Sequence, residues 1–155
     1  MKTDVLIVGA GPVGLTMACE LARYGLSVRI VDKNTQRTDK SKAIVVWPRT
    51  LELLSRMGSG IADRFVQAGL KAESTNIFAG GKQIASVELH NVDTPYKFVL
   101  LIQQSETERL LEENLAGLGV KVERQVELEN FDQNAESVTC NLAHGEGRKD
   151  GAKEN

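Results

Sequence analysis

Apolar and polar residues along the first 32 positions follow one another in the order expected for a strand, a helix and a second strand. Four consecutive apolar residues, Val5–Val8, include three β-branched side chains, which favours a buried parallel strand. Within residues 12–24, small residues then recur at every fourth position, at Gly14, Ala18 and Ala22. This spacing predicts a helix that lies close to a sheet, and the apolar residues within 27–32 predict a second strand. The segment therefore predicts a β-α-β unit.

The pattern after this unit predicts further short elements. Residues 33–42 are polar and have no apolar periodicity, so we expect a surface loop. Apolar residues recur at helical spacing over 51–57, and a second short helix is expected to end at Gly69. Residues 73–101 are expected to be rich in strands, with a hairpin turn at Gly80-Gly81.

The last third of the chain predicts one more helix and three strands. Ser105 stands three residues before Glu108, which is the spacing of a capping box, so we expect a helix to begin there. Strands are expected at residues 120–122, 126–131 and 137–142. Residues 145–155 have almost no apolar side chains to bury and are expected to form a polar tail.

Composition and charge narrow the classes of function. Of the 155 residues, 41% are apolar and 26% are charged, as in an ordinary globular protein. The net charge is −2 and no basic stripe occurs, so nucleic acid is not an expected partner. There is no apolar run of about 18 residues and no signal-peptide pattern, so we expect no membrane association and a cytoplasmic location. Cys19 and Cys140 lack metal-binding spacing and are expected to act as small buried apolar residues.

A candidate ligand-binding motif lies directly after the first expected strand, where Gly9, Gly11 and Gly14 follow the G-x-G-x-x-G spacing. In a dinucleotide-binding fold the first glycine permits a tight turn, the second lets a phosphate approach the backbone, and the third lets the helix pack on the strand. Pro12 suits the first turn of the helix, whose unpaired N–H groups attract a pyrophosphate. Asp32 ends the second strand, where an acid accepts hydrogen bonds from the adenosine ribose and disfavours a 2′-phosphate. These residues predict a site for NAD or FAD.

Three segments carry a family resemblance. The glycine turn reads G-A-G-P-V-G-L, which is typical of FAD-dependent oxidoreductases. Lys42-Ala43 followed by W-P-R-T-L-E-L-L at residues 47–54, and Q-S-E-T-E-R-L-L at residues 104–111, are similar to two motifs of the class A flavoprotein monooxygenases. The chain thus resembles these aromatic-ring hydroxylases, which are related to p-hydroxybenzoate hydroxylase. The resemblance implies an α/β, Rossmann-like FAD/NAD(P)-binding fold with an additional β-hairpin region. It also implies FAD as cofactor and hydroxylation of a small aromatic or polycyclic substrate with NADH or NADPH and O2.

The resemblance also implies individual cofactor contacts. The family residue at Lys42 is usually an arginine at the FAD pyrophosphate, the one at Gln104 contacts the ribityl and phosphate portion, and the one at Val126 lies at the adenine. Lysine keeps the positive charge but loses the bidentate fork of arginine. A solvated loop lysine and a polar residue before a helix are the alternatives for Lys42 and Gln104. Arg49 is expected to pair with Glu52 on a helix surface. The predicted cofactor-binding residues are Gly9, Gly11, Pro12, Gly14, Asp32, Lys33, Lys42, Gln104 and Val126.

Two later motifs of that family do not occur in the sequence, namely a strand ending in G-x-D-G-x-x-S-x-V-R and a G-D-A-A-H segment. Asp150-Gly151 has no apolar strand before it and is expected to lie in a loop. We therefore predict that residues 1–155 form the N-terminal part of an FAD-binding domain, with a β-rich insertion at about 73–101 and a polar tail at 145–155. Without later strands the edge of Val5–Val8 would be bare, which predicts either self-association into a homo-oligomer through that edge or marginal stability of the isolated chain.

Two alternatives remain open at this point. The chain could be an NAD-dependent dehydrogenase domain, or a nucleotide-binding fragment without catalysis. No cluster of His, Cys, Asp or Glu in the sequence suggests catalysis by side chains or a metal site, so no catalytic residue is predicted. We expect the 155-residue chain by itself to be inactive.

Overall fold

A computed structural model describes residues 2–37 and 45–145, and they form two compact units. The first unit comprises described residues of Met1–Arg37 and Leu111–Asn155, and the second those of Thr38–Leu110. Each unit mixes helices with strands. The prediction of a mixed α/β fold with an added hairpin region is confirmed. Among the described residues, no helix is both long and apolar enough to cross a membrane.

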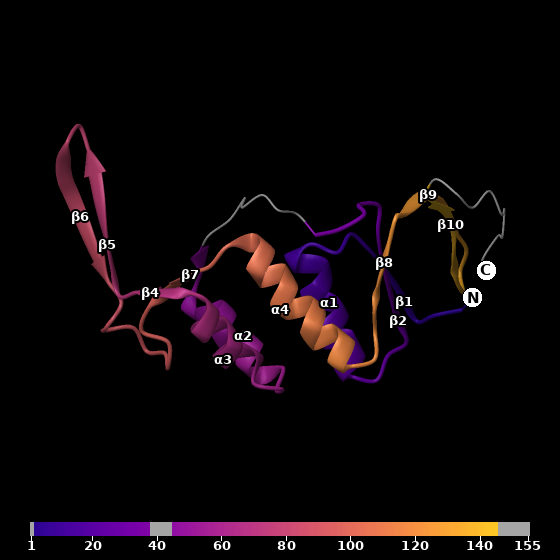
Figure 1. The fold of residues 1–155 in the computed structure, drawn as a ribbon, viewed down its shortest axis with the longest axis horizontal. Helices are drawn as coiled ribbons and strands as arrows, with labels where there is room; N and C mark the ends of the chain where they lie inside the picture. Colours follow the sequence, from indigo (N-terminus) through magenta and orange to yellow (C-terminus); the bar gives the residue numbers. More distant parts are fainter. Residues whose placement is uncertain (1, 38–44, 146–155) are drawn as a thin grey trace. The chain divides into compact units, whose positions relative to one another are not determined.

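The first unit is built on the predicted β-α-β segment. Strand β1 (Val5–Val8) leads into helix α1 (Pro12–Arg23) and strand β2 (Val28–Asp32). A third strand, β8 (Val122–Arg124), joins in parallel, so that the sheet has the order β1-β2-β8 (Figure 1). Strand β2 is central and its last four residues are buried, whereas β1 lies at one end of this sheet and is only partly buried.

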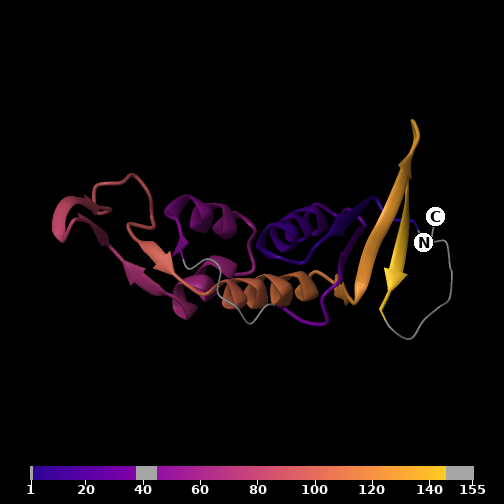
Figure 2. The ribbon, with the colours of Figure 1, turned by 90° about the horizontal axis from the view of Figure 1, so that it is seen from above.

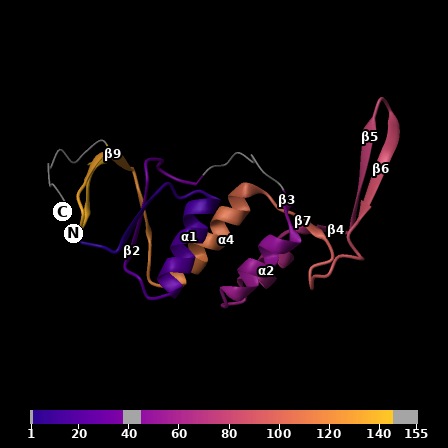
Figure 3. The same ribbon diagram turned by 180° about the vertical axis from the view of Figure 1, so that it is seen from behind.

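Helix α1 packs against the sheet and against the second half of helix α4 (Gln104–Gly117), as Figures 1 and 3 show. The buried core side chains of this unit include Leu15, Ala18 and Cys19 of α1, Ile30 and Val31 of β2, and Leu111 and Leu115 of α4. The Cys19 thiol lies 3.5 Å from the carbonyl oxygen of Leu111, and its burial raises its pKa. Cys19 therefore acts as a small core residue, as predicted. Cys140 is a free, partly exposed thiol, so the prediction that it is buried is wrong.

Strands β9 (Val126–Gln133) and β10 (Val138–His144) complete the first unit as an antiparallel hairpin, coloured orange to yellow in Figure 2. A register shift between Asn141 and Leu142 interrupts the pairing. Most side chains of β9 are exposed, so this hairpin contributes little to the core.

The second unit contains a small antiparallel sheet in the order β3-β7-β4, formed by β3 (Val45–Val46), β7 (Val99–Leu101) and β4 (Leu70–Ala72). Helices α2 (Pro48–Arg56) and α3 (Ile61–Ala68) bury Leu51, Leu54, Ile61 and Phe65. Arg49 pairs with Glu52 at 2.7 Å, as predicted.

The hairpin of the second unit, β5 (Ser74–Ala79) and β6 (Lys82–Glu88), extends away from β4 and β7 in Figures 1 and 3. Its turn is at Gly80-Gly81, as predicted, and both glycines have positive φ angles. Every residue of the two strands is exposed.

Several element boundaries differ from the sequence-based expectation, and for two of them the backbone hydrogen bonds give the reason. Helix α4 begins at Gln104, because the Gln103 carbonyl already accepts hydrogen bonds from the N–H groups of Glu106 and Thr107. Ser105 therefore lies inside the first turn, and the predicted capping box is wrong. Strand β8 begins at Val122 and not at residue 120, because the Val120 N–H bonds back to Leu115 and closes the helix end.

Candidate nucleotide site at the strand ends

The glycine turn connects the end of β1 to the start of α1 and has the backbone geometry that a phosphate site requires. Gly9 has a φ of 100°, a conformation that side chains disfavour, and its N–H donates to the Val31 carbonyl at 2.8 Å. Gly11 is extended, so its conformation does not require glycine. A Cβ at Gly11 would point into open space, which is where a ligand can approach the backbone.

Gly14 fixes the distance between α1 and β1. A Cβ at this position would lie 2.0 Å from the Gly9 carbonyl oxygen and 3.3 Å from Ile7 Cγ2. Pro12 occupies the first turn of α1 and has no N–H, so Val13 and Gly14 carry the unpaired N–H groups of this helix end. The turn therefore offers an uncrowded helix N-terminus with partial positive charge.

Asp32 lies beside this turn, at the end of the neighbouring strand β2. Its Oδ2 accepts a hydrogen bond from the Ala10 N–H at 2.7 Å, and its Oδ1 accepts two at 2.8 Å from the N–H and Nδ2 of Asn34. Burial alone would raise the pKa of Asp32, but these hydrogen bonds and the nearby Arg124 guanidinium lower it overall. The carboxylate is therefore held ionised and fixed relative to the glycine turn.

A cluster of ion pairs surrounds this carboxylate. Arg124 ends β8 directly opposite Asp32 in the parallel register, with Nη1 3.8 Å from Asp32 Oδ2. Glu112 of α4 accepts hydrogen bonds on Oε2 from Arg124 at 3.1 Å and from Arg37 at 3.2 Å. The carboxyl ends of β1, β2 and β8 thus meet at one edge of the sheet, which is where ligands bind in open α/β sheets.

Of the other four predicted site residues, two lie in the first unit near Asp32, one lies in the second unit, and one is outside the described residues. Lys33 follows Asp32 at the same edge, is largely exposed, and pairs with Glu127 at 3.4 Å. Val126 is buried at the start of β9, two residues after Arg124. Gln104 belongs to the second unit, where its Nε2 donates to Glu108 at 2.8 Å. Lys42 lies outside the described residues.

Sequence reasoning missed four contributors to this site: the Ala10 N–H, Asn34, Arg124 and Glu112. The contact of Asn34 could have been predicted from the sequence, because an aspartate often accepts a hydrogen bond from the N–H two residues later. Those of Arg124 and Glu112 could not, because only the folded register brings them to Asp32.

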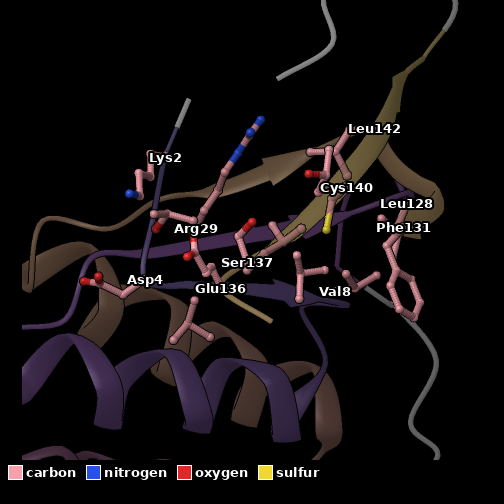
Figure 4. A pocket seen from close by; sticks show the side chains of 15 residues that line it. Lys2, Asp4, Val8, Arg29, Leu128, Phe131, Glu136, Ser137, Cys140 and Leu142 are labelled. Carbon is pink, nitrogen blue, oxygen red and sulfur yellow. The ribbon is translucent and has the colours of Figure 1, made fainter. Parts of the chain in front are cut away.

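A groove of about 910 Å³ lies along the edge of β1 that no other described strand pairs with, and under the β9–β10 hairpin (Figure 4). Val8, Phe131 and Val138 give it exposed apolar side chains. Arg29 also lines it but forms a bidentate pair with Glu123. Among the described residues, no group of three or more His, Cys, Asp or Glu side chains is placed to hold a metal ion.

The strand-end site fits the adenosine and pyrophosphate half of a dinucleotide. The open space above Gly11 and the unpaired N–H groups of α1 suit two phosphates, and the fixed carboxylate of Asp32 suits ribose hydroxyls.

Comparison with known proteins agrees with this geometry. The profile of a family described as "FAD binding domain" matches residues 2–154. The 6-methylpretetramide 4-monooxygenase of Streptomyces rimosus is 39% identical over 97% of this chain and 26% of its own length. The rifampicin monooxygenase of Streptomyces venezuelae is 34% identical over 92% of this chain and 29% of its own length.

Solved structures of two monooxygenases are also similar to this chain. The anhydrotetracycline hydroxylase of Streptomyces rimosus superposes with a TM-score of 0.83 at 32% identity, covering 95% of this chain and 29% of that protein. The p-nitrophenol 4-monooxygenase of Pseudomonas putida DLL-E4 also gives 0.83, at 26% identity, covering 92% of this chain and 36% of that protein.

The chain spans about a quarter to a third of the length of these relatives, which confirms that it is incomplete relative to the family. The matches favour the FAD-binding hypothesis over an NAD-dependent dehydrogenase domain. Motif, strand-end geometry and family match together show that this chain belongs to the FAD-binding domain family.

Proposed function

We propose that this chain supplies the adenosine- and pyrophosphate-binding part of a flavoprotein monooxygenase. The observation that carries the proposal is the fixed carboxylate of Asp32 next to an uncrowded helix N-terminus, in a chain whose relatives are FAD-dependent monooxygenases. The Gly9–Gly14 turn would hold the pyrophosphate and Asp32 the adenosine ribose. Lys33, Lys42, Gln104 and Val126 are proposed as further contacts along the same cofactor.

The reaction class follows from the relatives. Those compared here are named for 6-methylpretetramide, rifampicin, anhydrotetracycline and p-nitrophenol, which are aromatic or polycyclic molecules. When bound, FAD takes reducing equivalents from NADH or NADPH and activates O2 for hydroxylation. This chain's own residues bind and orient the cofactor, and none is assigned a proton-transfer step. We propose a cytoplasmic location because NAD(P)H is available there.

The test combines FAD titration with NAD(P)H oxidation. The purified chain is titrated with FAD and with NADH, and the consumption of NADH and NADPH is then followed in the presence of FAD and O2. Binding of FAD in preference to NADH supports the proposal. Tight binding of NADH without FAD would contradict it.

A second candidate is a nucleotide-binding fragment without turnover. It is favoured by the coverage of only 26% and 29% of two monooxygenase relatives. FAD binding without NAD(P)H consumption would assign this role to the isolated chain, whereas consumption above the rate of free FAD would exclude it.

A further inference from the structure

We propose that Arg124 is a positioning residue for the nucleotide and acts through Asp32 on the adenosine ribose. The inference rests on the proposed function, since it takes the glycine turn to hold an adenosine nucleotide. Arg124 and Asp32 end neighbouring strands in register, so the two residues stand side by side at the ligand-binding edge. Their closest charged atoms, Arg124 Nη1 and Asp32 Oδ2, are 3.8 Å apart.

The hydrogen bonds of Asp32 leave one acceptor position for a ligand. Oδ1 already accepts two hydrogen bonds, both from Asn34. From the described residues, Oδ2 accepts one hydrogen bond, from the Ala10 N–H. Each oxygen of a carboxylate accepts about two hydrogen bonds, so Oδ2 can take one more. A ribose hydroxyl is the ligand group that this remaining position suits.

Glu112 keeps Arg124 from taking that position. At 3.8 Å the Arg124 guanidinium is close enough to stabilise the ionised carboxylate but too far to hydrogen-bond to it. Its Nη2 is held instead by Glu112 Oε2 at 3.1 Å, and Arg37 holds the same oxygen at 3.2 Å. The charge of Arg124 thus acts on Asp32 while the last acceptor position stays open.

Two other described cations near Asp32, Lys33 and Arg37, pair with glutamates and are more exposed than Arg124. Lys33, in the loop after β2, pairs with Glu127 of β9, and both side chains are more than half exposed. Arg37 shares Glu112 and is 38% exposed, whereas the Arg124 side chain is only 18% exposed. Arg124 is therefore the cation of this cluster whose effect on Asp32 is least screened by solvent.

The experiment compares ADP with 2′,3′-dideoxy-ADP by isothermal titration calorimetry on the 155-residue chain. The two ligands share their phosphates, so the ratio of their affinities isolates the ribose hydroxyls. We expect the wild-type chain to prefer ADP by about tenfold, the effect of one hydrogen bond to a charged group. Arg124→Gln should reduce this preference to about twofold without changing the affinity for dideoxy-ADP.

Three further variants make the test specific. Lys121→Gln removes the same charge from an exposed position near the start of β8 and should leave the preference unchanged. Arg124→Lys keeps the positive charge and should retain most of the preference for ADP. Glu112→Gln releases the Arg124 guanidinium toward Asp32 and should lower the preference for ADP. This variant keeps the proposal testable if Arg124→Gln fails to fold.

Several results would overturn the inference. Equal weakening of both ligands by Arg124→Gln would show a purely structural role, and an unchanged preference would show no role. A wild-type chain that binds both ligands equally would refute the inference but leave the proposed nucleotide site in place. A wild-type chain that binds neither would contradict the proposed function itself.

Discussion

At the scale of single residues, Gly14 sets how closely α1 lies on β1. A Cβ at this position would meet the Gly9 carbonyl oxygen at 2.0 Å, so Gly14→Ala forces the backbone to shift. We expect a loss of about 1–3 kcal/mol in the free energy of unfolding, the usual cost of overpacking, measured by urea denaturation. Gly117→Ala is the matched control, because a Cβ there meets nothing within 4 Å in α4, and it should gain up to about 1 kcal/mol. Equal stability of Gly14→Ala and wild type would show that the turn is not tightly packed.

Asp32 predicts a pH dependence of stability. Its folded-state pKa is lowered, so its contribution is fully present above the unfolded-state value near about 3.9 and is lost as the pH falls through the folded value. Asp32→Asn should therefore be less stable than wild type at neutral pH, and the difference should shrink below about pH 4. Urea denaturation of both proteins from neutral to acidic pH measures this. A difference that is constant over the whole range would mean that the ionised state of Asp32 does not contribute.

The residues of the site differ in how far the sequence could predict them. Gly9, Gly14 and Asp32 were found because their roles depend on a local strand-turn-helix pattern and its spacing. Arg124 could not be predicted from the sequence, because its position opposite Asp32 depends on the register between two strands that are about 90 residues apart.

At the scale of elements, local patterns predicted which helices and strands exist better than where they begin. The β1, α1, β2 series and the turn at Gly80-Gly81 were confirmed because apolar period and glycine position agree there. The starts of α4 and β8 were misplaced by one and two residues, respectively. Both depend on backbone hydrogen bonds, such as Val120 to Leu115, that leave no trace in the apolar pattern.

The link between β8 and β9 carries a strained residue. Gln125 has a φ of 59°, its N–H bonds to the Asn34 carbonyl, and its own carbonyl accepts from Gly145 at 2.7 Å. A left-handed conformation costs a non-glycine residue about 1–2 kcal/mol, partly offset by the larger entropy of glycine in the unfolded chain. Gln125→Gly should therefore stabilise the chain by about 0.5–1 kcal/mol, or a few degrees in Tm, measured by thermal denaturation. Gln133→Gly, at the end of exposed β9, is the control and should not stabilise it. A lower Tm for Gln125→Gly than for the wild-type chain would contradict the claim that Gln125 is strained.

At the scale of the whole molecule, the unpaired edge of β1 predicts self-association. In the described chain, β1 pairs only with β2, and Val8 is 54% exposed beside the apolar groove of Figure 4. Unpaired edges add strands from other molecules, and a charge on such an edge opposes this. We expect wild-type chain to form dimers or larger species with rising concentration in analytical ultracentrifugation, and Val8→Lys to reduce them. Val92→Lys makes the same change at an exposed position of the second unit, outside any strand, and should leave association unchanged. A wild-type chain that stays monomeric at high concentration would contradict the prediction.

We propose that this chain binds the adenosine half of FAD through the glycine turn and Asp32. The most direct measurement is a competition titration in which bound FAD, followed by its fluorescence, is challenged with ADP or with FMN. ADP contains the adenosine and pyrophosphate portion, whereas FMN contains the flavin and only one phosphate. We expect ADP to displace FAD completely and FMN to leave it bound. Displacement by FMN with no effect of ADP would contradict it.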